Sequence, residues 1–367
     1  MPEEKTTVQL ETDPRLEEQG VGRNRLHIGV AANYPDSEET RFLLTPEACG
    51  LLTSASIAVC MEEGAGIDIN FSDEKYAEYG VKITDRKTVL SQDIVLSYAP
   101  LRADDVMRMR EGATLLCMMD DTLFSKGVIQ ALLDRKITLG CLSNMLSFNG
   151  EAVFANIIDE IDGRCSILYA QENLSYLGGG KGVLLGGVAG VNPCEVVLIG
   201  DGHDIMSAAR AALDQGASVT LLNNDISALQ LARVICGNRL QTLAIHPKVL
   251  FNKIKSADVI ISGNTTRPFE MPRNLTLAMK ESAFVLDLRE SHPSVSVPRS
   301  VAMAISNVMI NLLQDMALME GMERMIATTD GVQNGIITYR GRLVDKLAAS
   351  YLGMPCVDLS VMIAHPN

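Results

Sequence analysis

Two glycines that follow a short apolar run have the residue types and the spacing of a nucleotide-binding turn. The run Val196–Ile199 leads directly into Gly200-Asp201-Gly202. In a Rossmann-type site the first glycine permits a tight turn, the second lets the backbone approach a pyrophosphate, and a third lets the helix pack closely on its strand. Ile205 stands at the third position. We therefore predict a dinucleotide-binding turn with Gly200 and Gly202 as cofactor-binding residues and an incomplete fingerprint.

The residue that should bind the ribose is also altered. An acidic side chain about twenty positions after the turn normally bonds to the ribose hydroxyls. Here the apolar run Val219–Leu222 ends in Asn223, whose neutral amide binds a hydroxyl more weakly than a carboxylate does. Asn223 is our third candidate for cofactor binding. Residues 224–226 supply no arginine for the 2′-phosphate of NADP, so neither dinucleotide is well served.

Two aspartates, Asp201 and Asp204, lie in or beside the glycine turn. A helix N-terminus attracts anions through its free N–H groups and partial positive charge, so carboxylates here oppose a pyrophosphate. They could bridge a phosphate through a metal ion, or one of them could cap the helix in place of an anionic ligand. We favour capping, because no second cluster of carboxylates or histidines is identifiable to complete a metal site. We predict no metal, and dinucleotide binding that is weak or absent.

Short, nearly continuous apolar runs alternate with helical patterns along the whole chain, which is typical of parallel strands covered by helices on both faces. The sequence therefore predicts an α/β fold with two doubly wound, Rossmann-like domains that have parallel sheets and are joined by long helices. The expected strands are 26–30, 57–60, 94–97, 114–118 and 137–140 in the first domain, and 196–199, 219–222, 258–262 and 284–287 in the second.

The domain boundaries follow from this alternation. We expect a disordered acidic tail over 1–25, a substrate-type domain over 26–150 and 328–367, and a dinucleotide-binding-type domain with the bridging helices over 151–327. One bridging element is predicted as a long, methionine-rich buried helix from Val301 to Ile326. Four methionines at helical spacing in this part of the chain are interpreted as packing residues rather than as a copper site: Met316, Met319, Met322 and Met325.

Composition excludes several classes of function. The formal net charge is -13 over 367 residues, which argues against nucleic acid or anionic membranes as partners, since both require basic patches. The eight cysteines are scattered singly and are interpreted as reduced core residues. The acidic first 25 residues lack the apolar core of a secretory signal, so we expect a cytoplasmic protein.

Four blocks in order give the chain a resemblance to a known family. They are Glu39–Pro46 (ETRFLLTP), Glu63–Gly66 (EGAG), Gly180–Val191 (GKGVLLGGVAGV) and Gly341–Pro355 (GRLVDKLAASYLGMP). The chain resembles the alanine dehydrogenase and pyridine nucleotide transhydrogenase α-subunit family, as a divergent member. The resemblance implies NAD as cofactor, oxidative deamination of alanine or hydride transfer between nucleotides, and a homo-oligomer.

The resemblance also implies site residues, and several are not matched. Arg41 matches the family's carboxylate-binding arginine. The family's lysine has no counterpart in Tyr98-Ala99-Pro100, and the position of its catalytic histidine is taken by Asp120. The family's aspartate position falls on Ser291, beside Glu290, and the loop that should cover the nicotinamide is shortened. We therefore assign no catalytic residue, and we name Arg41 and Asp120 as the substrate-binding pair.

Two arrangements of that pair remain open. Arg41 and Asp120 could lie within hydrogen-bonding or water-bridged reach, because a buried guanidinium needs a counterion. Alternatively, Asp120 turns to solvent and Arg41 binds a small carboxylate ligand. Two functions remain open as well. One is a binding or regulatory protein without alanine dehydrogenase activity; the other is an NAD(P)-dependent oxidoreductase for a different small amino or keto acid, which uses Asp120 or Glu290.

Overall fold

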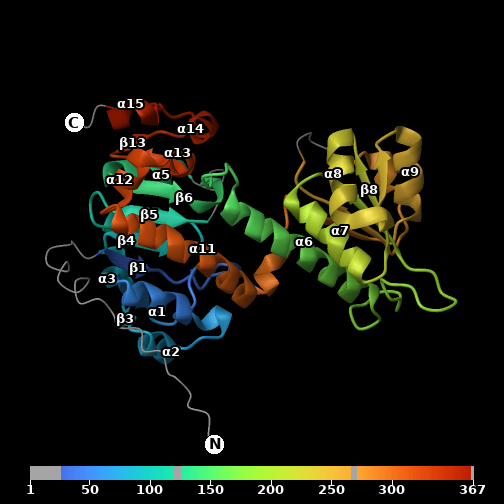
Figure 1. Ribbon diagram of the computed structural model, residues 1–367, viewed down its shortest axis with the longest axis horizontal. Coiled ribbons are helices and arrows are strands. Elements are labelled where there is room, and N and C mark those ends of the chain that lie inside the picture. Colours follow the sequence, from blue (N-terminus) through green and yellow to red (C-terminus); the bar gives the residue numbers. More distant parts are fainter. Residues whose placement is uncertain (1–25, 119–124, 266–270, 365–367) are drawn as a thin grey trace, which may run out of the picture.

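The computed structural model describes residues 26–118, 125–265 and 271–364. It has two α/β domains that lie side by side and are connected by the long helix α6 (Val153–Leu174) and by the segment that leads into α11 (Pro298–Leu318) (Figure 1). The expected class, two Rossmann-like α/β domains with parallel sheets, is confirmed.

The first domain is built on an eight-stranded sheet of order β13-β12-β6-β5-β4-β1-β2-β3. Its strands are β1 His27–Val30, β2 Ala58–Glu62, β3 Lys82–Thr84, β4 Ile94–Ser97, β5 Thr114–Cys117, β6 Thr138–Cys141, β12 Ile336–Tyr339 and β13 Arg342–Leu343. The first six strands are parallel, whereas β12 runs antiparallel to β6 and pairs with β13 at the sheet edge. The winding reverses between β1 and β4, and ligands of open α/β sheets bind beyond the carboxyl ends of such neighbours.

Short helices cover this sheet. They are α1 Pro46–Ser54, α2 Asp73–Glu78, α3 Arg86–Leu90, α4 Ala103–Arg108, α5 Lys126–Asp134, α12 Met322–Thr328, α13 Asp330–Gln333, α14 Lys346–Leu352 and α15 Leu359–Ala364. The sequence starts α1 where it does because the Thr45 side chain accepts a hydrogen bond from the N–H of Ala48 and Pro46 occupies the first helical position. This cap fixes the end of the β1–α1 segment, which carries Arg41.

The second domain has a five-stranded parallel sheet of order β11-β10-β7-β8-β9. Its strands are β7 Glu195–Ile199, β8 Ser218–Asn223, β9 Gln241–Ala244, β10 Val259–Ser262 and β11 Phe284–Asp287, and its helices are α7 His203–Asp214, α8 Ile226–Cys236, α9 Pro247–Ser256 and α10 Arg273–Thr276. The glycine turn joins β7 to α7 at the carboxyl end of the central strand. This is the place that a nucleotide site requires.

Helix α11 packs on the first domain, although we assigned both bridging helices to the second. Val301, Ile305 and Met309 of α11 are fully buried in the first domain's core. The single helix predicted for 301–326 is wrong, because Gly321 has a φ of 124° and separates α11 from α12. Of the described helices, α11 has the length and composition of a membrane span, but its buried side makes it a core helix.

Helices α6 and α7 approach each other very closely at a glycine. A Cβ atom added to Gly163 of α6 would lie 2.1 Å from the carbonyl oxygen of Asp204 in α7, which no side chain could tolerate without movement. The glycine therefore lets α6 pack against the first turn of α7, beside the glycine turn. This contact places the acidic side chains of α6 close to the glycine turn.

None of the eight cysteines, all of which lie in the described residues, forms a disulfide. Six are buried, Cys236 is half-buried, and Cys356 is exposed. Burial raises the pKa of Cys49 to about 12, so this thiol stays protonated. The methionines interpreted as packing residues also lie in or against the first domain's core.

Candidate functional site

A cleft of about 330 Å³ lies between the two domains, and elements of both form its walls. The first domain contributes Arg41 and Tyr98, α6 contributes Asp159 and Asp162, and the second domain contributes Asp204 with neighbouring backbone. The volume is at the lower end of the range for small-molecule sites. The cleft is our candidate functional site because it joins the carboxyl ends of β1 and β4 to the glycine turn.

Arg41 lies on the first-domain wall and is 4% exposed. Its Nε and Nη2 donate hydrogen bonds of 2.8 and 2.6 Å to the two carboxylate oxygens of Glu39, and its Nη1 donates to the Ser294 hydroxyl at 3.1 Å. A guanidinium has five N–H donors, so two remain on its outer edge. Glu39 is thus the counterion that burial requires. Asp120, the partner we proposed, lies outside the described residues.

Tyr98 lies beside Arg41, after β4, where the resemblance puts the family's lysine. The Arg41 guanidinium stacks 4.7 Å from the centre of the Tyr98 ring. The residue is 2% exposed, and its hydroxyl makes no hydrogen bond with any described residue although it lines the cleft. Burial raises the pKa of this phenol well above its usual range, so it stays neutral and can both donate and accept a hydrogen bond.

The N–H groups of Asp201 and Gly202 in the glycine turn find their acceptor in a neighbouring loop of the second domain. They donate to the carbonyl oxygen of Asn264 at 3.0 and 2.9 Å. The Asp204 carboxylate accepts the N–H of Ile205 and that of Asn264, both at 2.8 Å. Asp204 is 1% exposed, and burial raises its pKa. One of the chain's own carboxylates therefore occupies the first turn of α7, where a pyrophosphate would have to bind.

Glycine is required in this turn for backbone reasons. Gly200 has a φ of 143°, and a Cβ atom there would lie 2.8 Å from the Asn264 carbonyl oxygen and 2.9 Å from Ile205. A Cβ on Gly202 would lie 2.4 Å from an oxygen of Asp204. The glycines thus make room for Asn264, Ile205 and the aspartate, which fill the space around the turn.

Asn223 turns toward the same turn and is 6% exposed. Its amide nitrogen donates to the carbonyl oxygen of Gly200 at 3.0 Å, and its amide oxygen accepts the N–H of Asp225 at 2.7 Å. A carboxylate could not make the first of these bonds. Asn223 therefore stabilises the turn, and an amide is chemically required for the bond to Gly200.

Three carboxylates lie close together where α6 meets the side of the cleft next to the glycine turn. Asp159 and Asp162 are one helical turn apart on α6, and Asn264 joins Asp159 to Asp204 through its side chain and its N–H. The pKa of Asp159 is raised to about 7, first by burial and then by the negative charges of Asp204 and Asp162. Sequence reasoning missed this group, although acidic residues three apart on a buried helix were a usable signal.

His292 and Glu290 occupy different positions. The His292 Nδ1 atom lies 3.6 Å from an Asp162 oxygen, and the same carboxylate accepts the N–H of Ser294 at 2.7 Å. Glu290, our alternative proton donor, is exposed and is not among the residues that line the cleft. Among the described residues no group of three histidine, cysteine or carboxylate side chains could hold a metal ion.

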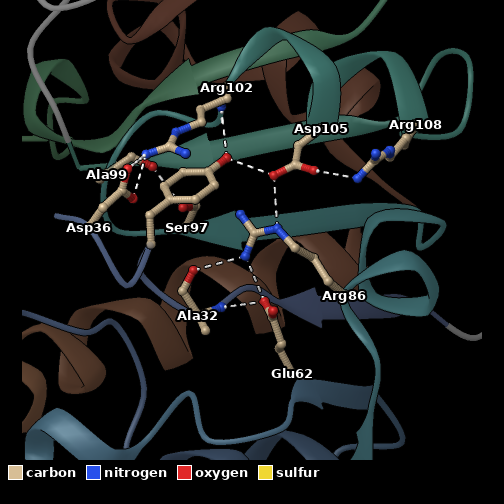
Figure 2. Close-up of polar contacts among 10 residues, drawn as sticks. Ala32, Asp36, Glu62, Arg86, Ser97, Ala99, Arg102, Asp105 and Arg108 are labelled. Carbon is tan, nitrogen blue, oxygen red and sulfur yellow. Dashed lines mark hydrogen bonds and ion pairs between the residues drawn. The ribbon is translucent and has the colours of Figure 1, made fainter.

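A second hollow of about 630 Å³ lies on the first domain alone and is lined by paired charges. Figure 2 shows Arg86 between Glu62 and Asp105, with Nη1 and Nε at 2.8 Å from their carboxylate oxygens. The Tyr34 hydroxyl donates to Asp105 at 2.7 Å and accepts the N–H of Arg102 at 2.8 Å. These groups pair with one another, except for the buried Arg86 Nη2 atom, which has no hydrogen-bond partner among the described residues, and the network holds the segment after β1 in place.

Two Rossmann-like domains, a connecting helix and a cleft at the carboxyl ends of their central strands are the architecture of the two-domain nucleotide-dependent dehydrogenases. Family models described as Alanine dehydrogenase/PNT, N-terminal domain and C-terminal domain, match residues 29–151 and 166–288. The chain belongs to the alanine dehydrogenase and pyridine nucleotide transhydrogenase family.

The chain is similar in sequence to alanine dehydrogenases and in fold to two solved structures. The alanine dehydrogenase of Mycolicibacterium smegmatis is 26% identical over 372 residues, which cover 92% of this chain and 100% of that protein. The alanine dehydrogenase of Methanococcus maripaludis is 30% identical over 236 residues, 64% of this chain and 63% of its own. A solved L-alanine dehydrogenase has a TM-score of 0.80 at 22% identity and covers 89% of this chain and 99% of its own. A transhydrogenase from Sinorhizobium meliloti has a TM-score of 0.71 at 16% identity, with 87% and 99% coverage.

Proposed function

We propose that this chain is a divergent family member that does not oxidise alanine and binds dinucleotides weakly or not at all, and that it serves as a ligand-binding or regulatory protein. One observation carries the proposal: beside the glycine turn, the Asp204 carboxylate accepts the N–H groups of Ile205 and Asn264, at 2.8 Å each. The residues that stand at the family's NAD site therefore do not fit the pyrophosphate of that cofactor.

The acid–base groups support the same proposal. Oxidation of alanine needs a cation for the carboxylate, a proton donor for the carbonyl or imine, and a nicotinamide held against the substrate carbon. Arg41 can supply the first requirement through its two remaining donors. No lysine is among the described residues that line the cleft, and the one histidine there, His292, lies beside Asp162. A single positioned acid–base group commonly contributes roughly 100- to 10,000-fold to a rate, so its loss removes useful activity.

The ligand of this proposed role is a small carboxylate-bearing molecule held at Arg41. The protein is proposed to act in the cytoplasm as a homo-oligomer, without nucleic acid or membrane as partner. The test of dinucleotide binding is calorimetric titration of the purified full chain with NAD and with NADP. We expect neither dinucleotide to bind with a Kd below about 1 mM. Micromolar binding of either dinucleotide would contradict the proposal.

Asp159 favours a second candidate function, an NAD(P)-dependent oxidoreductase for a different small amino or keto acid. Its pKa of about 7 is that of a group able to donate and accept protons near neutral pH. A panel of amino and keto acids assayed with NAD and NADP distinguishes the two functions. Turnover that is lost in Asp159→Asn would support the oxidoreductase, and the absence of turnover across the panel would support the binding protein.

A further inference from the structure

The charges of the cleft do not balance. Arg41 is paired with Glu39, and Arg289, at the rim, is paired with Asp287 through its Nε at 2.9 Å. Both cations are therefore already neutralised. Among the described residues, no hydrogen bond or ion pair joins the carboxylates of the acidic group, Asp159, Asp162 and Asp204, to a lysine or an arginine; the His292 Nδ1 atom lies 3.6 Å from Asp162, and the Arg41 charge acts on Asp162 only at longer range.

Polar groups at the other end of the cleft still have free hydrogen-bonding capacity. The Tyr98 hydroxyl is unpartnered among the described residues in a side chain that is 2% exposed, and it faces the cleft. The two N–H donors left on Arg41 point away from Glu39, because Glu39 occupies the Nε–Nη2 edge. A buried hydroxyl and an arginine edge form a carboxylate-binding end, since each can donate to a carboxylate oxygen.

We propose that the cleft binds a basic α-amino acid, with the carboxylate on Arg41 and Tyr98 and the ammonium groups at Asp159, Asp162 and Asp204. A zwitterion with a single ammonium group would leave negative charge at the three aspartates uncompensated. A ligand with one carboxylate and two ammonium groups matches the uneven charge of the cleft. The inference rests on the proposed binding function, because a bound dinucleotide would need the same space.

The test is calorimetric titration of the full chain at pH 8 with three probes of matched length. Lysine has both ends, norleucine lacks the terminal ammonium group, and 1,5-diaminopentane lacks the carboxylate. We expect lysine to bind at least 10-fold more tightly than either analogue. Equal affinity for lysine and norleucine, or failure of all three to bind below about 10 mM, would overturn the inference.

Two variants locate the two ends of the ligand. Asp159→Asn should weaken lysine binding about 10-fold and norleucine binding by less, since only lysine offers a second ammonium group. Tyr98→Phe should weaken both by a similar factor, because it removes one hydrogen bond to the shared carboxylate. Glu160→Gln is the matched control: it is the next residue of α6, its side chain is 51% exposed, and it pairs with Arg164 outside the cleft. Unchanged lysine binding in Asp159→Asn would place the ammonium group elsewhere and refute the assignment.

The same preparation is assayed for NADH formation with alanine, which separates the two claims. Robust turnover would contradict the proposed function whatever the probes do. An inactive chain that binds none of the three probes would contradict only the assignment of a basic amino acid.

Discussion

Replacing Asp204 by alanine should turn a closed nucleotide turn into an open one. The Asp204 carboxylate accepts hydrogen bonds of 2.8 Å from the N–H groups of Ile205 and Asn264. The substitution removes this buried carboxylate and so releases both N–H groups. A phosphate oxygen could then accept these donors at the first turn of α7, where the helix dipole also favours an anion. We therefore expect Asp204→Ala to gain affinity for pyrophosphate and for NAD.

The magnitude follows from the charge that is removed. One pair of unit charges about 4 Å apart repels by about 4 kcal/mol at an effective dielectric constant of about 20. Burial raises the pKa of Asp204, so protonation relieves part of this repulsion. We therefore expect Asp204→Ala to bind pyrophosphate or NAD more favourably by about 1.4 to 2.8 kcal/mol, which corresponds to roughly 10- to 100-fold in affinity.

The substitution also has a cost in stability, which provides an internal check. Loss of two hydrogen bonds to a charged acceptor costs about 3 kcal/mol in total at the low end of the usual range. For a chain of this kind that lowers Tm by roughly 6–12 °C, and pyrophosphate should restore part of it.

The assay is calorimetric titration with NAD and pyrophosphate, accompanied by melting curves with and without pyrophosphate. Asp214→Ala is the control, because Asp214 lies at the other end of α7 and its side chain is 71% exposed. If Asp204→Ala binds pyrophosphate no better than Asp214→Ala, the carboxylate does not block the turn and the reasoning fails.

Three further changes test the same site. Asn223→Asp should destabilise the protein by about 1–3 kcal/mol without improving NAD binding, because a carboxylate cannot donate to the Gly200 carbonyl oxygen; tighter NAD binding in a titration would count against this. The pKa of Asp159 is raised to about 7, so its contribution to folding stability is present below about pH 4 and is lost as the pH rises through 7. Asp159→Asn should therefore have a higher Tm than the unmodified protein at pH 8 and no advantage at pH 4. Tm profiles that stay parallel across this pH range would argue against the raised pKa. Gly163→Ala should lower Tm markedly, since its Cβ would lie 2.1 Å from the Asp204 carbonyl oxygen; an unchanged melting curve would show that α6 and α7 pack less closely.

The sequence predicted the buried strands and the apolar edge strand β11, but it missed edge strands whose residues form no apolar run. The central strands, such as 94–97, are continuous apolar runs because helices cover both faces of the sheet. Strands β3 and β9 were not predicted, since they lie at sheet edges and their half-exposed residues form no apolar run. β12 was missed for a different reason: it follows two successive helices, α12 and α13, and adds to the sheet antiparallel, outside the alternation that identified the others.

The candidate site was only partly predictable, because its parts meet through tertiary contacts. The glycine turn follows a local pattern that can be read from the chain, whereas Arg41 was assigned from the resemblance to the family. The position of Asp159 depends on the contact between α6 and α7 at Gly163, which no local pattern records. Glu39, two residues from Arg41, supplies a counterion that we did not predict. The predicted pairing of Arg41 with Asp120 stays a prediction, because Asp120 lies outside the described residues.

The most direct test of the central claim is a turnover measurement on the full chain. NADH formation is followed with alanine and NAD, and NADH consumption is followed with pyruvate and ammonia. With the glycine turn closed by Asp204 and no lysine among the described cleft residues, we expect no rate above the background of buffer. Turnover within the ordinary range of dehydrogenases, about 1 to 1,000 per second, would contradict the account.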